Sequence, residues 1–183
     1  MSREYYYFAA SLPLLDFDSK PIMNLGSFLS ECQRLLAPED FLLVEKALTL
    51  PRVEENAGHC FVEAWHSFER AFSNELVYFR AGRLHKDPNE YIKGERAFSA
   101  HLADIIQQAM KMTDLLMAEK MIDKVRWSFL DELLTGHYFD IEMIIGYALK
   151  LQILERHQLF SSSLGEERFK QYQQISLPDA VRV

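Results

Sequence analysis

Large apolar residues recur every three or four positions along the middle of this chain, and this spacing constrains the fold more than any other feature. The stripe consists of Phe61, Trp65, Phe68, Phe72, Leu76 and Phe79. Residues at this spacing share one face of an α-helix, whereas a strand would place them on alternating faces. The pattern predicts a helix of about twenty residues that begins near His59 and buries an aromatic face.

Capping signals predict further helices on both sides of the stripe. Each signal combines a polar residue or a proline at the start with apolar residues at helical spacing behind it. The predicted starts are Asn24, Pro38, Asp87-Pro88-Asn89-Glu90, Asp140 and Ser163-Leu164-Gly165-Glu166, and the last of these helices would bury Phe169 and Tyr172. Gly136 is expected to end the helix that precedes Asp140.

The apolar pattern changes phase in the second half of the chain. A first stripe contains Phe98, Leu102, Ile105, Ala109, Met112 and Leu116, and a second contains Ile122, Val125, Phe129 and Leu133. The stretch Ala118-Glu119-Lys120 separates them, so we expect a break or bend within 118–123. Because Met112 lies on the first stripe, we expect it in the core rather than on a binding surface.

These signals together predict an all-α fold, with residues 1–183 forming a single domain built as an antiparallel helical bundle. Only the Tyr5–Leu12 stretch has the composition of a strand, and one strand cannot form a sheet. We expect residues 1–23 to form an N-terminal aromatic segment packed on the bundle. The expected core contains Phe61, Trp65, Phe68, Phe72, Leu102, Ile105, Phe129, Leu133, Ile144, Leu151 and Phe169.

Charge and hydropathy restrict the partners. The chain has 20 basic and 27 acidic residues and a net charge of −7, which disfavours binding to nucleic-acid phosphates. The longest apolar block, residues 143–149, is far shorter than the ~20 residues that a membrane-spanning helix needs. Cys32 and Cys60 form no paired motif, and two cysteines make no disulfide framework. We therefore expect a cytoplasmic protein that has no nucleic-acid partner and reaches a membrane only through its partners.

Sequence motifs for nucleotide binding and nucleophilic catalysis do not occur in the chain. It contains no GxxxxGK[ST], GxGxxG or GxSxG run. Such runs build the backbone cradle for phosphates or the sharp turn that carries a nucleophilic serine. We therefore expect no catalytic residue and no cofactor, and a protein that is not an enzyme.

His59, Glu63 and His66 form the sharpest candidate for a metal site. Their spacing of four and three places all three on one helical face, and Glu63 and His66 match the Glu-x-x-His motif of di-iron helical bundles. Such a centre needs a second copy of the motif, which the chain does not contain. We therefore expect no metal here, with the three side chains on the wetter side of the aromatic stripe.

The aromatic run Tyr5, Tyr6 and Tyr7 is the first candidate for a protein-contact surface, because aromatic side chains anchor many interfaces. The same residues also take part in a resemblance. Tyr5-Tyr6-Tyr7-Phe8-Ala9-Ala10-Ser11-Leu12-Pro13 resembles the start of an uncharacterised bacterial family whose genes accompany V-type ATP synthase genes.

A second stretch resembles the C-terminal region of that family and, more distantly, the C-type rotor adaptor of V/A-type ATPases, which is the d-type adaptor of eukaryotes. It comprises residues 131–142 and 147–156. In the shared pattern, a helix entered after a phenylalanine, here Phe139, carries Tyr147, then Leu-Lys, then Glu155 and Arg156, ahead of a short closing helix. The C-type adaptor is a larger body of repeated helical lobes, and this chain is shorter.

The resemblance implies a non-catalytic protein, similar to the C-type adaptor, that links the central rotor shaft to the proteolipid ring of a V-type ATP synthase. It implies partner contacts at Tyr147, Glu155 and Arg156 in addition to the N-terminal tyrosines. Two alternatives remain open from the residues. One is a metal-binding helical-bundle protein or enzyme that uses His59, Glu63 and His66, and the other is a regulatory adaptor unrelated to the ATPase.

Overall fold

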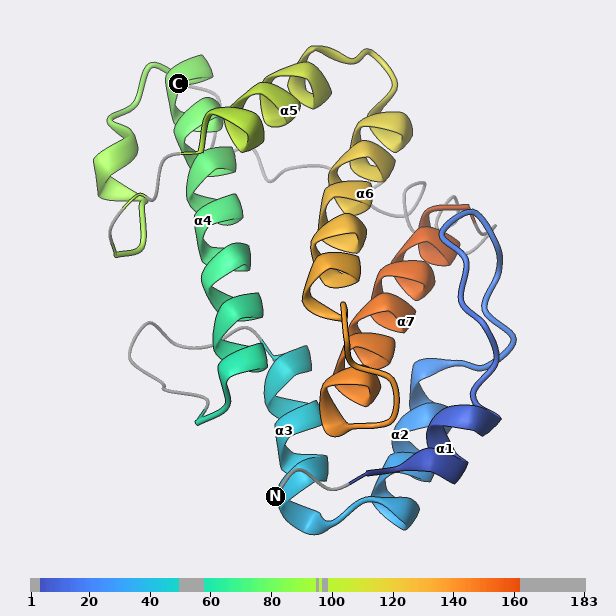
Figure 1. The fold of residues 1–183 in the computed structure, drawn as a ribbon. Helices are drawn as coiled ribbons and strands as arrows, with labels where there is room; N and C mark the ends of the chain where they lie inside the picture. The colour runs from blue at the N-terminus through green and yellow to red at the C-terminus, as the bar shows by residue number, and fades with distance from the viewer. Residues whose placement is uncertain (1–3, 50–57, 95, 97–98, 162–183) are drawn as a thin grey trace, which may run out of the picture.

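The computed structural model describes residues 4–49, 58–94, 96 and 99–161, and the described residues form an all-α fold (Figure 1). Its helices are α1 (Tyr6–Ser11), α2 (Leu25–Leu35), α3 (Pro38–Leu48), α4 (Cys60–Arg83), the short 3₁₀ helix η1 (Pro88–Glu90), α5 (Ala100–Lys111), α6 (Leu115–Leu133) and α7 (Ile141–Ser161). The structure is 72% helical, and no strand occurs among the described residues. The expectation of a helical bundle is confirmed.

Helix α7 lies at the centre of the bundle, where it packs against α2, α3 and α6. Buried side chains occur all around it: Ile141, Ile144, Ile145, Tyr147, Ala148, Leu149, Leu151, Ile153 and Leu154. A helix that is apolar on all sides is stable in water only when other elements surround it. Asp140 starts α7 as the sequence predicts, because its Oδ1 accepts a hydrogen bond from the Met143 backbone N–H at 3.2 Å.

The buried residues form two clusters. The larger one, the α7 core, combines α7 with Phe8, Phe28, Cys32, Leu36, Val44, Ala47, Phe61, Val62, Trp65, Trp127 and Leu130. The smaller one, the α5 core, contains Phe72, Leu102, Ile106, Ala109, Ala118 and Ile122. Phe68 of α4 packs against both clusters. Helices α4 and α6 therefore run from one core into the other.

The helix starts follow the sequence signals, with one displaced break. Asn24 accepts a hydrogen bond from the Ser27 backbone N–H at 2.7 Å, and Pro38 occupies the first turn of α3. The break expected within 118–123 is wrong, because the chain leaves the helix at Met112. It re-enters at Leu115, where the Asp114 carboxylate accepts hydrogen bonds from the first turn of α6.

Two other local expectations are corrected. The signal at Asp87 produces only one turn, η1, and α5 starts later, where Ser99 caps it. The strand-like stretch from Tyr5 is a short helix, α1, whose Phe8 ring stacks on Phe28 with centroids 5.9 Å apart. The N-terminal segment thus packs on the bundle as expected. The helix predicted after Ser163, with Phe169 and Tyr172, lies outside the described residues.

Most of the predicted core is buried. Phe61, Trp65, Phe72, Leu102, Ile144 and Leu151 are buried, while Phe68, Ile105, Phe129 and Leu133 are partly buried. Met112 is the clear error, because 40% of it is exposed at the end of α5. Among the described residues, no helix is long and apolar enough to cross a membrane.

Candidate functional site

Tyr5 belongs to the interior contacts of the N-terminal segment rather than to an open surface. Its backbone N–H donates a hydrogen bond to the Phe139 carbonyl, and its hydroxyl donates one to the Asp40 carboxylate. The same hydroxyl accepts a hydrogen bond from the Ala37 backbone N–H at 3.3 Å, at the start of α3. Tyr5 therefore fixes α1 against α3 and against the turn that precedes α7.

Tyr6 and Tyr7 lie on the outside and form the N-terminal surface together with Tyr138 and Phe139. Tyr7 is 95% exposed, and the Tyr6 ring lies against the Phe139 ring with centroids 4.8 Å apart. Tyr138 and Phe139 are also exposed. Four neighbouring aromatic side chains in contact with water are a favourable anchor for another protein. Sequence reasoning found Tyr6 and Tyr7 but not the pair from the α6–α7 turn.

A second exposed apolar surface, the α5–α6 tip, consists of Met112, Leu115, Leu116 and Met117. Leu115 is 79% exposed, and the other three are 40–54% exposed. Methionine and leucine at such a position can adapt to a partner of varied shape. The sequence pattern assigned Met112 to a core because it did not reveal that the chain turns at this point.

The two surfaces lie at opposite ends of the molecule, with α6 between them (Figure 1). The α5–α6 tip includes the first residues of α6, and Tyr138 and Phe139 follow its last residue, Leu133. A helix of this length spans about 28 Å. The surfaces are therefore far enough apart to contact two different partners at once.

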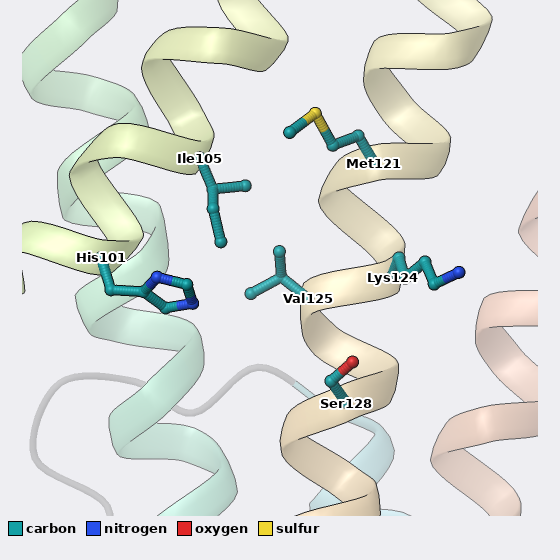
Figure 2. A pocket seen from close by; sticks show the side chains of 6 residues that line it. All are labelled: His101, Ile105, Met121, Lys124, Val125 and Ser128. Atoms are coloured by element: carbon teal, nitrogen blue, oxygen red, sulfur yellow. The ribbon is translucent and has the colours of Figure 1, made fainter.

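A hollow of about 270 Å³ lies between α5 and α6 (Figure 2). Ile105, Met121 and Val125 point into it, whereas the Lys124 side chain leads away from it. Ligand pockets usually combine an apolar lining with several polar groups that converge on one point. This hollow lacks such convergence, and we interpret it as incomplete packing at the edge of the α5 core.

Tyr147, Glu155 and Arg156 lie where they connect elements of the bundle. Tyr147 is buried, and its hydroxyl donates a hydrogen bond to the Pro13 carbonyl at 3.0 Å, so its assignment to an open contact surface is corrected. Burial also raises the pKa of Tyr147, which keeps the phenol protonated. Glu155 accepts a hydrogen bond from the Leu25 backbone N–H at 2.6 Å and thereby caps α2.

Arg156 belongs to a buried ionic network that joins α4, α6 and α7. Asp123 is 1% exposed and accepts hydrogen bonds from Arg126, Arg156 and His157 at 2.6–3.1 Å. Arg126 also pairs with Glu69 at 2.6 Å. Burial alone would lower the pKa of Arg126, but the two carboxylates outweigh it and the pKa is raised, so the guanidinium stays charged. The contacts described for the network lie within the chain, and they hold three helices together.

The structure does not bring His59, Glu63 and His66 together as ligands. Glu63 is exposed and accepts a hydrogen bond from the Gly58 backbone N–H at 3.2 Å. His66 is buried rather than on a wet face, and its ring nitrogen donates to the Lys46 carbonyl at 3.1 Å, at the end of α3. His59 precedes α4 and faces Glu142 instead, 3.5 Å away. A helical spacing misleads here because His59 is the cap and has extended backbone.

The two thiols occupy different environments. Cys32 is buried in the α7 core, where burial raises its pKa to about 12, so it stays protonated and unreactive. Cys60 is exposed at the start of α4, and neither cysteine forms a disulfide in the structure.

Comparison with known proteins gives one match. A family model described as a protein of unknown function, DUF2764, matches residues 99–175. The match covers less than half of the chain and includes α5, α6 and α7, and with them the α5–α6 tip and the turn that carries Tyr138 and Phe139. No curated protein and no solved structure matches the chain.

Proposed function

We propose that this protein is a non-catalytic adaptor that joins the central shaft to the proteolipid ring of a V-type ATP synthase. The observation that carries the adaptor role is the pair of exposed apolar surfaces at opposite ends of α6, the N-terminal surface and the α5–α6 tip. A protein that links two partners needs two such surfaces and a body between them that does not bend.

The body between the surfaces has features that resist bending. Helices α4 and α6 run through both cores, and the buried Glu69–Arg126–Asp123 pairs connect them. Interiors packed in this way have low compressibility and transmit force. A load applied at the α5–α6 tip would therefore reach the α6–α7 turn through packed side chains rather than through a loop.

The ATP synthase as the setting rests on the two sequence stretches that resemble a family encoded beside V-type ATP synthase genes and, more distantly, the C-type rotor adaptor. Within these stretches, Tyr147, Glu155 and Arg156 act in this proposal by positioning α7, α2 and the N-terminal segment. The net charge of −7 suits basic loops on a partner. The exposed tyrosines Tyr6 and Tyr7 are the proposed contacts.

Affinity purification tests the proposal. A tagged copy expressed in the source cells should recover the shaft and ring proteins of the ATP synthase. A Tyr6→Ala/Tyr7→Ala double variant should recover fewer of them and keep the helical circular dichroism spectrum. Tyr91→Ala is the matched control, because Tyr91 is also an exposed tyrosine but lies next to η1. Recovery of a different complex without ATP synthase components would favour a regulatory adaptor and overturn the proposal.

A further inference from the structure

Two histidines and two carboxylates converge where α4 and α7 begin. His137 Nδ1 lies 2.6 Å from Asp140 Oδ2 and 4.0 Å from Glu142 Oε2. On the other side of Glu142, His59 Nε2 lies 3.5 Å from Oε1. Within the part of the chain that the structure describes, His137, Asp140 and Glu142 are the one group of three whose ligand atoms all lie within 4.8 Å of one another.

Two atoms of this cluster are buried without a hydrogen-bond partner, Glu142 Oε2 and His59 Nδ1. Their side chains are only 14% and 19% exposed. A buried polar atom without a partner destabilises the fold, and such atoms are uncommon in native proteins. A cation bound between His137 and Glu142 would satisfy Glu142 Oε2, and its positive charge would balance the two carboxylates.

The mixture of donors favours one class of ion. Imidazole nitrogens and carboxylate oxygens together suit zinc and similar divalent transition metals, whereas magnesium and calcium prefer oxygen ligands alone. Ligand atoms around tetrahedral zinc lie about 3.4 Å apart, given bonds of about 2.0–2.2 Å. The separations of 3.5 and 4.0 Å in the cluster are close to this value. The pair His137–Asp140 would lengthen as the metal replaces its hydrogen bond.

We propose that His137, Asp140 and Glu142, with His59 as the fourth donor, form a binding site for a divalent transition metal such as Zn²⁺. The site joins the start of α4 to the turn before α7. Gly136, with φ of 92°, allows the chain to reverse there, and the His137 backbone N–H donates to the Leu134 carbonyl. Asp140 Oδ1 caps α7 and leaves Oδ2 toward His137.

The metal has a structural role in this arrangement. His137 and Asp140 flank Tyr138 and Phe139, so a metal bound to both residues fixes the turn that carries half of the N-terminal surface. The inference does not depend on the ATP synthase proposal, because it rests on the ligand geometry alone.

Zinc titration of the untagged, chelator-washed full chain tests the site. Calorimetry against a competing chelator should show one Zn²⁺ per chain, and zinc should raise the melting temperature. His137→Gln and Glu142→Gln should each weaken binding by at least about 100-fold, because even residues that only support a metal ligand contribute up to that factor. Circular dichroism of each metal-free variant should match the parent spectrum.

Matched controls separate this site from the alternatives. Cys60→Ser and His85→Gln remove an exposed thiol next to His59 and an exposed imidazole far from the cluster, and both variants should bind zinc as the parent does. Visible absorption of the Co²⁺-loaded protein should show tetrahedral coordination without a thiolate band. The proposal is overturned if zinc does not bind, if binding survives both His137→Gln and Glu142→Gln, or if Cys60→Ser abolishes it.

Discussion

The α7 core and the α5 core are built from similar side chains but differ in how completely other elements enclose them. The α7 core surrounds a central helix with α1, α2, α3, the first part of α4 and the end of α6. The α5 core fills the space among only three helices, and the hollow between Ile105 and Val125 lies at its edge. Exposed apolar side chains at the α5–α6 tip continue outward from it.

The difference indicates a division of work within one fold. Extensive enclosure makes the α7 core the source of stability. The α5 core exposes apolar residues at its end, which costs stability in the isolated protein and provides a surface for a partner. Regions with few buried contacts open more readily than the core of the same protein.

The largest expected effect is a difference between two isoleucines, Ile144 in the α7 core and Ile106 in the α5 core, both fully buried. Ile144→Ala should lower the free energy of unfolding by about 4 kcal/mol and Ile106→Ala by about 2–3 kcal/mol, because a less enclosed site collapses more easily around the cavity. Urea unfolding of both variants measures the difference. Equal losses, or a larger loss for Ile106→Ala, would contradict the comparison.

The ionic network that connects the two cores should give the next effect. Asp123→Asn leaves Arg126, Arg156 and His157 around a neutral amide in a site where Asp123 is 1% exposed. Removing one partner of a buried charge pair costs about 3 kcal/mol or more. Asp131→Asn is the control, since Asp131 pairs with Lys150 at an exposed position and should change stability by less than about 1 kcal/mol. Similar losses for the two variants would show that the network is solvated.

Close packing of α7 against the end of α6 predicts a smaller effect at Gly146. A Cβ atom there would lie 2.6 Å from Leu134 Cδ2, so Gly146→Ala should destabilise the fold by about 1–2 kcal/mol. In a Leu134→Ala background the same change should be neutral or stabilising, because alanine is the better helix former. A loss that persists in that background would place the obstruction elsewhere.

The smallest expected effect is a pH dependence at His66, which ties α4 to the end of α3. Burial lowers the pKa of His66 below its ordinary 6.5, so the folded chain keeps the ring neutral while the unfolded chain takes up a proton. Stability from this residue is therefore present above about pH 6.5 and declines as the pH falls through the lowered value. The advantage of the parent over His66→Gln should shrink between about pH 8 and about pH 5.5. An advantage that is constant or grows toward acid would contradict the burial of His66.

Local signals in the sequence predict much of this fold because they act over a few residues. Asn24, Pro38 and Asp140 start helices where the pattern places them, and the stripe from Phe61 to Phe72 faces the interior. The sequence pattern fails where the outcome depends on a distant contact. The stretch from Tyr5 becomes a helix because it packs on α2 and on the α6–α7 turn.

The candidate sites were harder to predict for the same reason. Tyr138 and Phe139 join Tyr6 only through the fold, as do His59 and Glu142. The position of the α5–α6 tip depended on one cap. Asp114 ends the preceding stripe four residues before the phase change, and a search for caps within the long stripe would have found it.

The central claim is that the two surfaces at the ends of α6 bind different partners at the same time. Quantitative mass spectrometry of complexes purified on tagged variants tests it most directly, with Tyr6→Ala/Tyr7→Ala at one end and Leu115→Ser/Leu116→Ser at the other. Leu42→Ser, an exposed leucine on α3, is the control for the second variant. The account predicts that each double variant loses one set of ATP synthase components and retains the other. Loss of both sets by either folded variant, or of neither set by both, would contradict it.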